Sequence, residues 1–279
     1  MKRSIRASIA QETVKIIKEG FYIANEKKVD IRQQIKQCQS STILYKPTDF
    51  DRIKEILSKQ VAKKVLETEV VNDTTLSVAN RLISENRYQH VACLNFASAK
   101  NPGGGFLGGS QAQEESLCRA SALYGSLVHQ TEYYEYNRNR RTALYSDYMI
   151  FSPNVPVFRD EQGKLLENTY LLSFITAPAV NAGAVRKNEP KKVNQINSIM
   201  LSRAEKVLAI AAIYHCDALI LGAWGCGVFQ NDPADVAHCW LTHLNENELF
   251  KNRFSQISFA VFDISKKQEA YQAFLERFT

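Results

Sequence analysis

Short apolar runs alternate along most of the chain with longer stretches in which apolar residues recur at helical spacing. The short runs are rich in β-branched and aromatic residues, which predicts buried strands. The predicted strands cover residues 65–71, 91–96, 148–151, 170–176, 218–221 and 257–262. The main predicted helices cover 75–84, 193–214, the stretches after residues 113 and 232, and the C-terminus. This alternation is typical of an α/β fold.

The first sixty residues have a different pattern. A helix is expected up to Gly20, with its apolar residues on roughly one face: Ile5, Ile9, Val14 and Ile17. A second helical stretch begins around Asp49. No linker rich in proline or glycine separates this region from the rest. We therefore expect an N-terminal, mainly helical accessory extension over residues 1–60, packed as one folded unit on a catalytic domain over residues 61–279.

Two polar stretches are less regular. Residues 131–141 are rich in Tyr, Asn and Arg, which is consistent with an ordinary polar helix or with a surface that lines a substrate. Residues 157–165 predict a small peripheral hairpin with its turn near Gln162 and Gly163.

The strand at 91–96 leads into a glycine-rich loop. Five glycines fall within seven positions: Gly103, Gly104, Gly105, Gly108 and Gly109. Glycine permits positive φ and lets backbone N–H groups approach a ligand, so the loop suits a phosphate. After Gln113, Glu114 and Glu115, apolar and small residues recur at helical spacing as far as Tyr124. The two glutamates therefore lie at the start of a helix, where the helix dipole tolerates carboxylates.

Other interpretations of this loop remain open. Gly103, Gly105 and Gly108 form a literal GxGxxG, but a nicotinamide-binding fold would need the helix to open at the loop. Here several residues intervene. The glycines could also serve structure alone, and two glutamates at a helix start are often solvated capping residues.

Residues 218–233 repeat the same design: an apolar strand, a glycine loop, and a helix with Asn231 or Asp232 as N-cap and Pro233 near its first position. Two such loops at the carboxyl ends of neighbouring strands could bind two phosphates, which suggests a diphosphate ligand such as a nucleotide sugar. Cys226 lies between two glycines of the second loop. It is a candidate nucleophile, although a small residue that fits a tight turn is the favoured interpretation.

Together these motifs resemble the bacterial-type poly(ADP-ribose) glycohydrolases, which are macrodomains with an N-terminal extension. The resemblance rests on a glycine triplet followed by QEE and on the downstream GAWGCGVFQNDP. It extends over nearly the whole chain through RASIAQETVKIIKEGFY, VVNDTTLSVANRL, MIFSPNVPVFRDEQGKLL and SFITAPAVNAGAV, in that order. It implies a three-layer α/β/α fold with a mixed central sheet.

The resemblance also implies roles for the two glutamates. Glu115 would be the general acid/base and Glu114 a ligand of ribose hydroxyls. Adjacent side chains on a helix diverge by about 100°, so the two carboxyls are expected to have different tasks. The implied activity is hydrolysis of ribose–ribose O-glycosidic bonds in poly(ADP-ribose), which releases ADP-ribose.

Further substrate contacts are expected around both loops. Asn95, Asn101 and Gln113 are candidate ribose contacts. Phe229 resembles the aromatic residue with which the family orients the ribose, although it could instead anchor the loop in the core. Asn72, Asp73 and Thr74 could hold the adenosine end or cap a helix. The remaining predicted binding residues belong to the two loops: Gly103, Gly104, Gly105, Gly225, Cys226, Gly227 and Val228.

Composition narrows this picture. The net charge of +6 over 279 residues favours acidic ligands. Lys187, Lys191 and Lys192 form a basic cluster that suits either a solvated loop or a polyanionic substrate. The six cysteines form no CxxC and no HExxH occurs, so we expect reduced thiols, no metal and no cofactor. The basic start lacks the apolar core of a signal peptide, and a cytoplasmic protein without membrane contact is expected.

The expected partners are poly(ADP-ribose) or ADP-ribosylated macromolecules, with ADP-ribose as product. The oligomeric state is open, and a monomer is favoured. Two other functions remain: a mono-ADP-ribosyl hydrolase that acts on a protein side chain or a nucleobase, and a non-catalytic reader of ADP-ribose. The intact pair of Glu114 and Glu115 argues against the reader.

Overall fold

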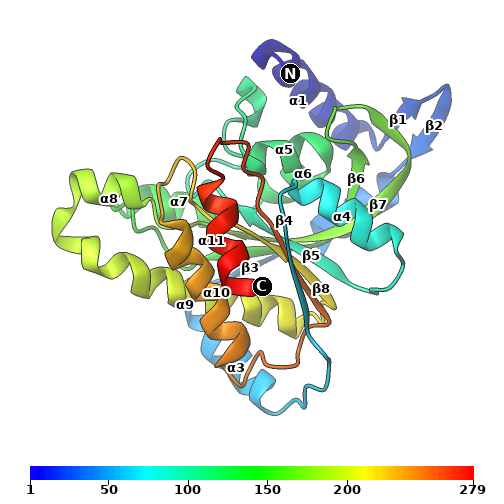
Figure 1. The fold of residues 1–279 in the computed structure, drawn as a ribbon. Helices are drawn as coiled ribbons and strands as arrows, with labels where there is room; N and C mark the ends of the chain where they lie inside the picture. The colour runs from blue at the N-terminus through cyan, green and yellow to red at the C-terminus, as the bar shows by residue number, and fades with distance from the viewer.

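The computed structural model describes residues 1–279 and is built on one mixed sheet of seven strands (Figure 1). In spatial order these are β3 (Ile43–Tyr45), β6 (Met149–Arg159), β7 (Leu165–Ala177), β5 (Val91–Phe96), β8 (Ala218–Leu221), β9 (Gln256–Ala260) and β4 (Glu67–Val71). The five strands from β7 to β4 are parallel, and β6 runs antiparallel to both of its neighbours. The sheet is therefore mixed, as the family resemblance implied.

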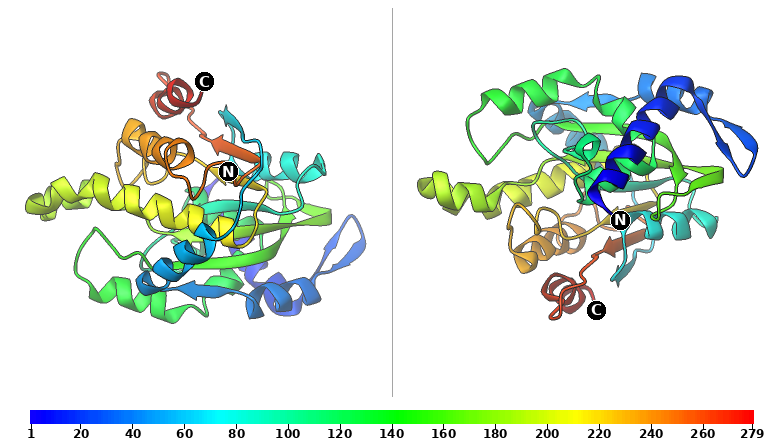
Figure 2. Two further views of the ribbon diagram at one scale, coloured as in Figure 1. Left: turned by 90° about the horizontal axis from the view of Figure 1, so that it is seen from below. Right: turned by 90° about the horizontal axis from the view of Figure 1, so that it is seen from above.

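Helices cover both faces of the sheet (Figure 2). One face packs against α3 (Phe50–Ser58), α9 (Ile196–Ile213), α10 (Pro233–Asn245) and α11 (Glu269–Phe278). The other packs against α1 (Arg3–Glu19), α2 (Arg32–Ser40), α4 (Thr75–Ser84), α5 (Gln113–Ala120) and α6 (Leu123–Leu127). Strand β5 shows the division, since Ala92 and Leu94 belong to the first core and Val91 and Cys93 to the second. The predicted three-layer fold is confirmed.

The remaining elements pack around these layers, and several add buried side chains to the two cores. They are the two-stranded sheet of β1 (Phe21–Ala24) and β2 (Lys27–Asp30), the helices α7 (Thr131–Asn139) and α8 (Ala182–Asn188), and the 3₁₀ turns η1 (Pro47–Asp49), η2 (Phe106–Gly108) and η3 (Pro190–Gln195). Residues 131–141 thus form mainly a helix. None of the helices combines the length and the apolar character needed to cross a membrane.

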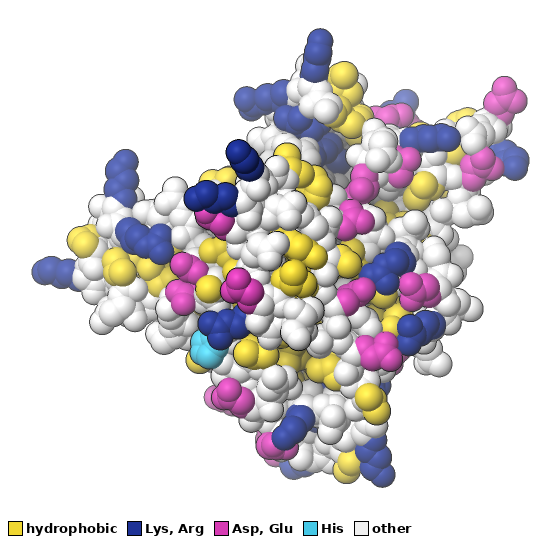
Figure 3. Space-filling model, in the orientation of Figure 1, with side chains coloured by type: hydrophobic (Ala, Val, Ile, Leu, Met, Phe, Trp, Pro, Cys, Tyr) yellow, Lys and Arg dark blue, Asp and Glu magenta, His cyan; other side chains and the backbone are white.

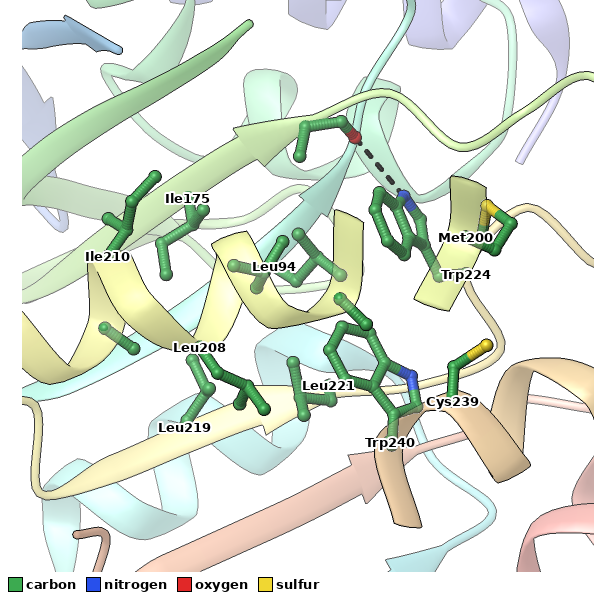
Figure 4. Packing of buried hydrophobic residues seen from close by; sticks show 14 of the residues in the cluster. Leu94, Ile175, Met200, Leu208, Ile210, Leu219, Leu221, Trp224, Cys239 and Trp240 are labelled. Carbon is green, nitrogen blue, oxygen red and sulfur yellow. Dashed lines mark hydrogen bonds between the residues drawn. The ribbon is translucent and has the colours of Figure 1, made fainter. Parts of the chain in front are cut away.

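Two stacked tryptophans anchor the second glycine loop in the core (Figure 4). The rings of Trp224 and Trp240 lie 5.8 Å apart between centroids. Trp224 Nε1 donates a hydrogen bond of 3.2 Å to the carbonyl of Ala177, the last residue of β7. Because a buried indole N–H needs a partner, this bond ties the loop after β8 to the end of a second strand.

Several predicted helices form over nearly the predicted residues. Helix α4 spans exactly the residues that were predicted, and α9 begins three residues later because η3 occupies the start. Helix α10 begins at Pro233 with Asp232 as its N-cap, whose side chain accepts from the N–H of Ala234 at 2.8 Å.

The helix after the first loop ends earlier than its spacing predicted. Helix α5 ends at Ala120 and does not continue through Tyr124. Ser121 is extended and forms a bridge with Val157 of β6, and the next N–H, that of Ala122, donates to the carbonyl of Pro156 at 3.0 Å. Pairing with a distant strand therefore overrides the helical periodicity at this point.

The predicted apolar face of the first helix is confirmed only in part, because Val14 and Ile17 pack against the core and Ile5 does not. Helix α1 ends at Glu19 with Gly20 as its C-cap, as predicted, but Ile5 is 49% exposed, and the fully buried positions are Ala10, Thr13 and Ile16. Thr13 Oγ1 donates to the carbonyl of Arg119 at 2.7 Å. Small and polar residues such as Ala10 and Thr13 thus join the apolar residues of the helix in its buried face.

The hairpin was predicted to be small and peripheral, which is also wrong. Its strands are the ends of β6 and β7, the two longest strands of the sheet. The turn at Gly163 is as predicted, and it lies close to Ile9 of α1. In Figure 1 the hairpin curves away from the sheet towards α1.

The predicted extension shares the sheet and both cores with the rest of the chain. Strand β3 pairs with β6, and Phe50, Ile53 and Leu57 of α3 are buried in the core with α9. The division at residue 60 remains a prediction.

Candidate active site

Both glycine loops lie at the carboxyl edge of the sheet. The first, residues 97–112, follows β5, and the second, residues 222–232, follows β8. The two strands are adjacent and parallel, with Cys93 opposite Ile220. The two loops therefore lie side by side, as expected for loops that follow neighbouring parallel strands.

Glu114, in the first turn of α5, is buried, with 3% of its surface exposed. Its Oε2 accepts from the N–H of Ser98 at 2.7 Å, and its Oε1 accepts from Asn95 Nδ2 at 3.3 Å. Burial raises the pKa of this carboxyl to about 8, with a further rise from the nearby Glu115, while the two hydrogen bonds oppose the shift. Glu114 is thus a carboxyl held in a fixed position away from bulk water.

Glu115 points to a different environment. Its Oε1 accepts from the N–H of Gly105 at 3.0 Å, and the residue is partly exposed. Gly104 has φ +59°, and a Cβ atom there would lie 2.5 Å from Glu115 Oε1. The loop therefore wraps closely around this carboxylate, which only glycine permits. The predicted divergence of the two glutamates is found.

Two predicted ribose contacts instead bond mainly to the protein. Gln113 Oε1 accepts from the N–H of Phe96 at 2.8 Å, and its Nε2 donates to the carbonyl of Leu94 at 2.7 Å. These bonds fasten the start of α5 to the end of β5. Asn95 is fully buried and donates to Glu114 and to Thr176 Oγ1, at 3.1 Å for the latter, while its Oδ1 has no partner. Their contact with ribose remains a prediction.

Asn101, the third of these candidates, is exposed in the first loop. Its carbonyl accepts from the N–H of Gly104 at 3.0 Å, and its own N–H donates to Ser98 Oγ at 3.1 Å. Its side chain is left free for a ligand. Gly103, by contrast, is buried against Phe106 and Cys118.

The second loop combines a tight turn with an open stretch. Gly225 has φ +75°, and a Cβ there would lie 2.5 Å from both Ala179 Cβ and Asn231 Nδ2. At Gly227 no atom lies within 4 Å of such a Cβ. The backbone is therefore compact at the base of the loop and accessible at its tip.

The environment of Cys226 argues against a role as nucleophile, because burial raises the pKa of its thiol far above the ordinary value. This favours its interpretation as a small residue in a turn. Val228, two residues further on, is 83% exposed. The ring of Phe229 is partly exposed and lies 5.9 Å from that of Tyr145, a residue with φ +58°.

A cavity of about 770 Å³ adjoins the loops on the side of α1. Its lining includes residues at the carboxyl ends of four strands: Asp73, Thr74, Phe96, Cys226, Gly227 and Phe262. Glu114, Glu115 and Phe229 do not line it. A ligand that both reacts at Glu115 and fills the cavity must therefore be elongated and cross the glycine loops.

The residues after β4 have separate tasks. Asn72 exchanges two hydrogen bonds with the backbone of Asp263, at 3.0 and 2.9 Å. Thr74 is the N-cap of α4, since its Oγ1 accepts from the N–H of Ser77 at 3.3 Å. Asp73 lines the cavity. The capping interpretation thus holds for Thr74, and Asp73 keeps a binding role as a prediction.

Sequence reasoning missed two aromatic residues of this region. Phe262 follows the last strand and is 60% exposed at the cavity. The position of Phe262 at the end of a predicted strand could have identified it as a candidate binding residue. Tyr145, which supports Phe229, carried no such signal, because only the fold brings the two rings together.

Comparison with protein families matches residues 10–160 to the catalytic domain of microbial-type PARG, the poly(ADP-ribose) glycohydrolases. The chain belongs to this family. The poly(ADP-ribose) glycohydrolase of Thermomonospora curvata is 42% identical, with a TM-score of 0.94, and the match covers 99% of this chain and 100% of that one. A structure of the same enzyme bound to the inhibitor ADP-HPD gives a TM-score of 0.90 over the same shares.

The poly(ADP-ribose) glycohydrolase from Deinococcus radiodurans in complex with ADP-ribose is also similar. It is 42% identical with a TM-score of 0.82, and the match covers 87% of this chain and 96% of that one. A search of curated proteins finds no match.

Within the glycohydrolase fold of this chain, no group of three or more His, Cys, Asp or Glu side chains is arranged to hold a metal ion.

Proposed function

We propose that this chain hydrolyses the ribose–ribose O-glycosidic bonds of poly(ADP-ribose), releases ADP-ribose, and uses Glu115 as general acid/base. Its membership of the glycohydrolase family supports the activity. The single observation that supports the role of Glu115 is its position. It is a partly exposed carboxyl at the start of α5, bonded to the N–H of Gly105 in the first glycine loop.

In the first step, protonated Glu115 transfers its proton to the oxygen that links the reacting ribose to the next unit. The bond between C1″ and that oxygen breaks, and its electron pair leaves with the oxygen as a hydroxyl group. The ribose becomes an oxocarbenium-like cation. A diphosphate held between the two loops would place negative charge near that cation.

In the second step, the Glu115 carboxylate takes a proton from a water molecule that attacks C1″. The product is ADP-ribose with a free hydroxyl at C1″, and Glu115 is protonated again. The hydrogen bond from the N–H of Gly105 would keep the carboxyl group of Glu115 in one orientation during both steps. One group that acts first as acid and then as base suffices, so no second carboxyl needs to approach the opposite face.

Glu114 would hold the ribose and Phe229 would orient it. The buried carboxyl of Glu114 is positioned by Ser98 and Asn95, so a ribose hydroxyl could donate to it without reorganisation of the side chain. Phe229 is braced by Tyr145 and by the bond of 3.0 Å from the N–H of Gly183 to its carbonyl.

Product analysis tests this proposal. The protein is incubated with poly(ADP-ribose) and, separately, with proteins that carry a single ADP-ribose on a defined side chain. We expect ADP-ribose from the polymer. Release from the mono-ADP-ribosylated substrates alone would favour the side-chain hydrolase, and binding of ADP-ribose without any cleavage would favour the reader.

A further inference from the structure

Six basic side chains lie on the first glycine loop or on segments at α7 and α8, two helices that are hydrogen-bonded to the glycine loops. All six are exposed, and none takes part in a salt bridge. They come from the first glycine loop, the end of α7 and the residues after it, and α8. We call them the basic rim: Lys100, Arg138, Arg140, Arg141, Arg186 and Lys187. Figure 3 shows basic side chains on the projecting end of the molecule formed by α8.

Two members of the rim are fastened to the two glycine loops. Arg138 Nε donates to the carbonyl of Lys100 at 2.8 Å, three residues before the glycine triplet. Arg186 donates through one terminal nitrogen to the carbonyl of Gln230 at 2.9 Å, next to Phe229. Each guanidinium keeps further N–H donors for a ligand. The rim is therefore attached to the same backbone that shapes the site.

The rim and the cavity lie at opposite ends of the site. None of the six side chains lines the cavity, whose walls include α1 and the ends of β4 and β9. In the view from above, α7 and α8 lie on one side of the loops and α1 on the other (Figure 2, right). A ligand that extends from the cavity past Glu115 and beyond the loops would therefore continue towards the side of α7 and α8, which carries the rim.

We propose that the basic rim binds the diphosphate of the polymer unit beyond the scissile bond, an inference that rests on the proposed function. The bond that Glu115 would break joins the reacting ribose to that next unit, so the rest of the polymer lies on the rim side. Each unit carries a diphosphate, and Lys and Arg bind phosphate oxygens through charge-assisted hydrogen bonds. Helix α7 carries two glutamates, of which Glu132 is paired with Lys46 and Glu135 forms no salt bridge. The six cations of the rim therefore outnumber the unpaired carboxylate of this helix.

The test removes two charges of the rim and keeps the hydrogen bonds from Arg138 and Arg186 to the glycine loops. In Lys100→Gln/Lys187→Gln, both altered side chains lack hydrogen bonds to the protein, so the loops stay supported by Arg138 and Arg186. The matched control is Lys63→Gln/Arg277→Gln. It removes the same charge from the segment before β4 and from the last turn of α11.

Binding is measured in the Glu115→Gln background, so that the polymer stays intact. The dissociation constant of end-labelled polymer is determined at several salt concentrations, and that of ADP-ribose is determined by calorimetry. We expect the rim variant to bind polymer about three- to tenfold more weakly at low salt, with a shallower salt dependence. The control should behave like its parent, and the affinity for ADP-ribose should stay within about twofold in both.

Equal polymer affinity in the rim variant and the control would overturn the proposal. So would a loss of ADP-ribose affinity as large as the loss of polymer affinity, because the rim would then support the loops alone. Cleavage of polymer by the unmodified protein is assayed separately. An unmodified protein that binds polymer through the rim and leaves it uncut would contradict the proposed function and leave the rim in place.

Discussion

Replacement of Glu115 by Gln tests the assigned chemistry most directly. The structure indicates that this change is local. An amide oxygen can still accept from the N–H of Gly105, which lies 3.0 Å from the carboxylate, and Gln has nearly the same volume as Glu. The glycine loop and the partly exposed position of the side chain should therefore be retained. What is lost is the proton that Glu115 would give to the leaving oxygen and later recover from water.

The expected loss follows from general acid/base catalysis, which contributes about 100- to 10,000-fold to a rate. This corresponds to about 3 to 5 kcal/mol of transition-state stabilisation. The variant should therefore release ADP-ribose from polymer at a rate at least about a hundredfold below that of the unmodified protein. Its dissociation constant for ADP-ribose should change little, because the backbone of both loops is unaltered.

Three measurements belong together: single-turnover release of ADP-ribose from polymer, calorimetry with ADP-ribose, and thermal unfolding. The matched control is Glu114→Gln, which alters the adjacent carboxyl. We expect it to weaken both binding and turnover, since both Glu114 oxygens accept from N–H donors and an amide can offer only one acceptor. Near-normal cleavage by folded Glu115→Gln would refute the mechanism.

Three further predictions concern the surroundings of this residue. Phe229→Ala should lower kcat more than it weakens ADP-ribose binding, because the ring would supply orientation while the loops supply affinity; an unfolded variant, or one with normal kcat and poor binding, would indicate an anchoring role. Burial raises the pKa of Glu114 to about 8 from an ordinary 4.5, so its contribution to stability is complete below about pH 4.5 and is lost as the pH rises through about 8. Glu114→Gln should therefore flatten the fall in Tm over that range, and parallel Tm profiles would contradict the shift. Cleavage should continue unchanged in a chelator, and loss of activity that a divalent ion restores would show that a metal takes part.

Much of the fold could be predicted from the sequence because local patterns encode it. The strand at 91–96, the helix at 75–84 and the N-cap at Asp232 depend on the burial or capping of a few consecutive residues. The two glycine loops were recognisable for the same reason. Gly104 and Gly225 are required by a turn or by a close approach of another group. Such glycines can be recognised in the sequence before the contacts of the loop are known.

Contacts between distant segments were decided by the tertiary structure alone. Pairing of Ser121 with Val157 ended a helix whose periodicity continued, and contact of α1 with α5 made Thr13 a buried residue in place of Ile5. Local spacing reports that one face of an element is buried, but it does not specify which distant surface covers that face.

The site shows the same division. The sequence placed Glu114 and Glu115 at the start of a helix beside a glycine loop, and their divergence followed from helix geometry. Only the folded chain buries Glu114 against Asn95 and Ser98 and leaves Glu115 partly exposed, with a hydrogen bond from the N–H of Gly105. The difference between the two carboxyls arises from desolvation and hydrogen bonding, and both depend on groups brought together by the sheet.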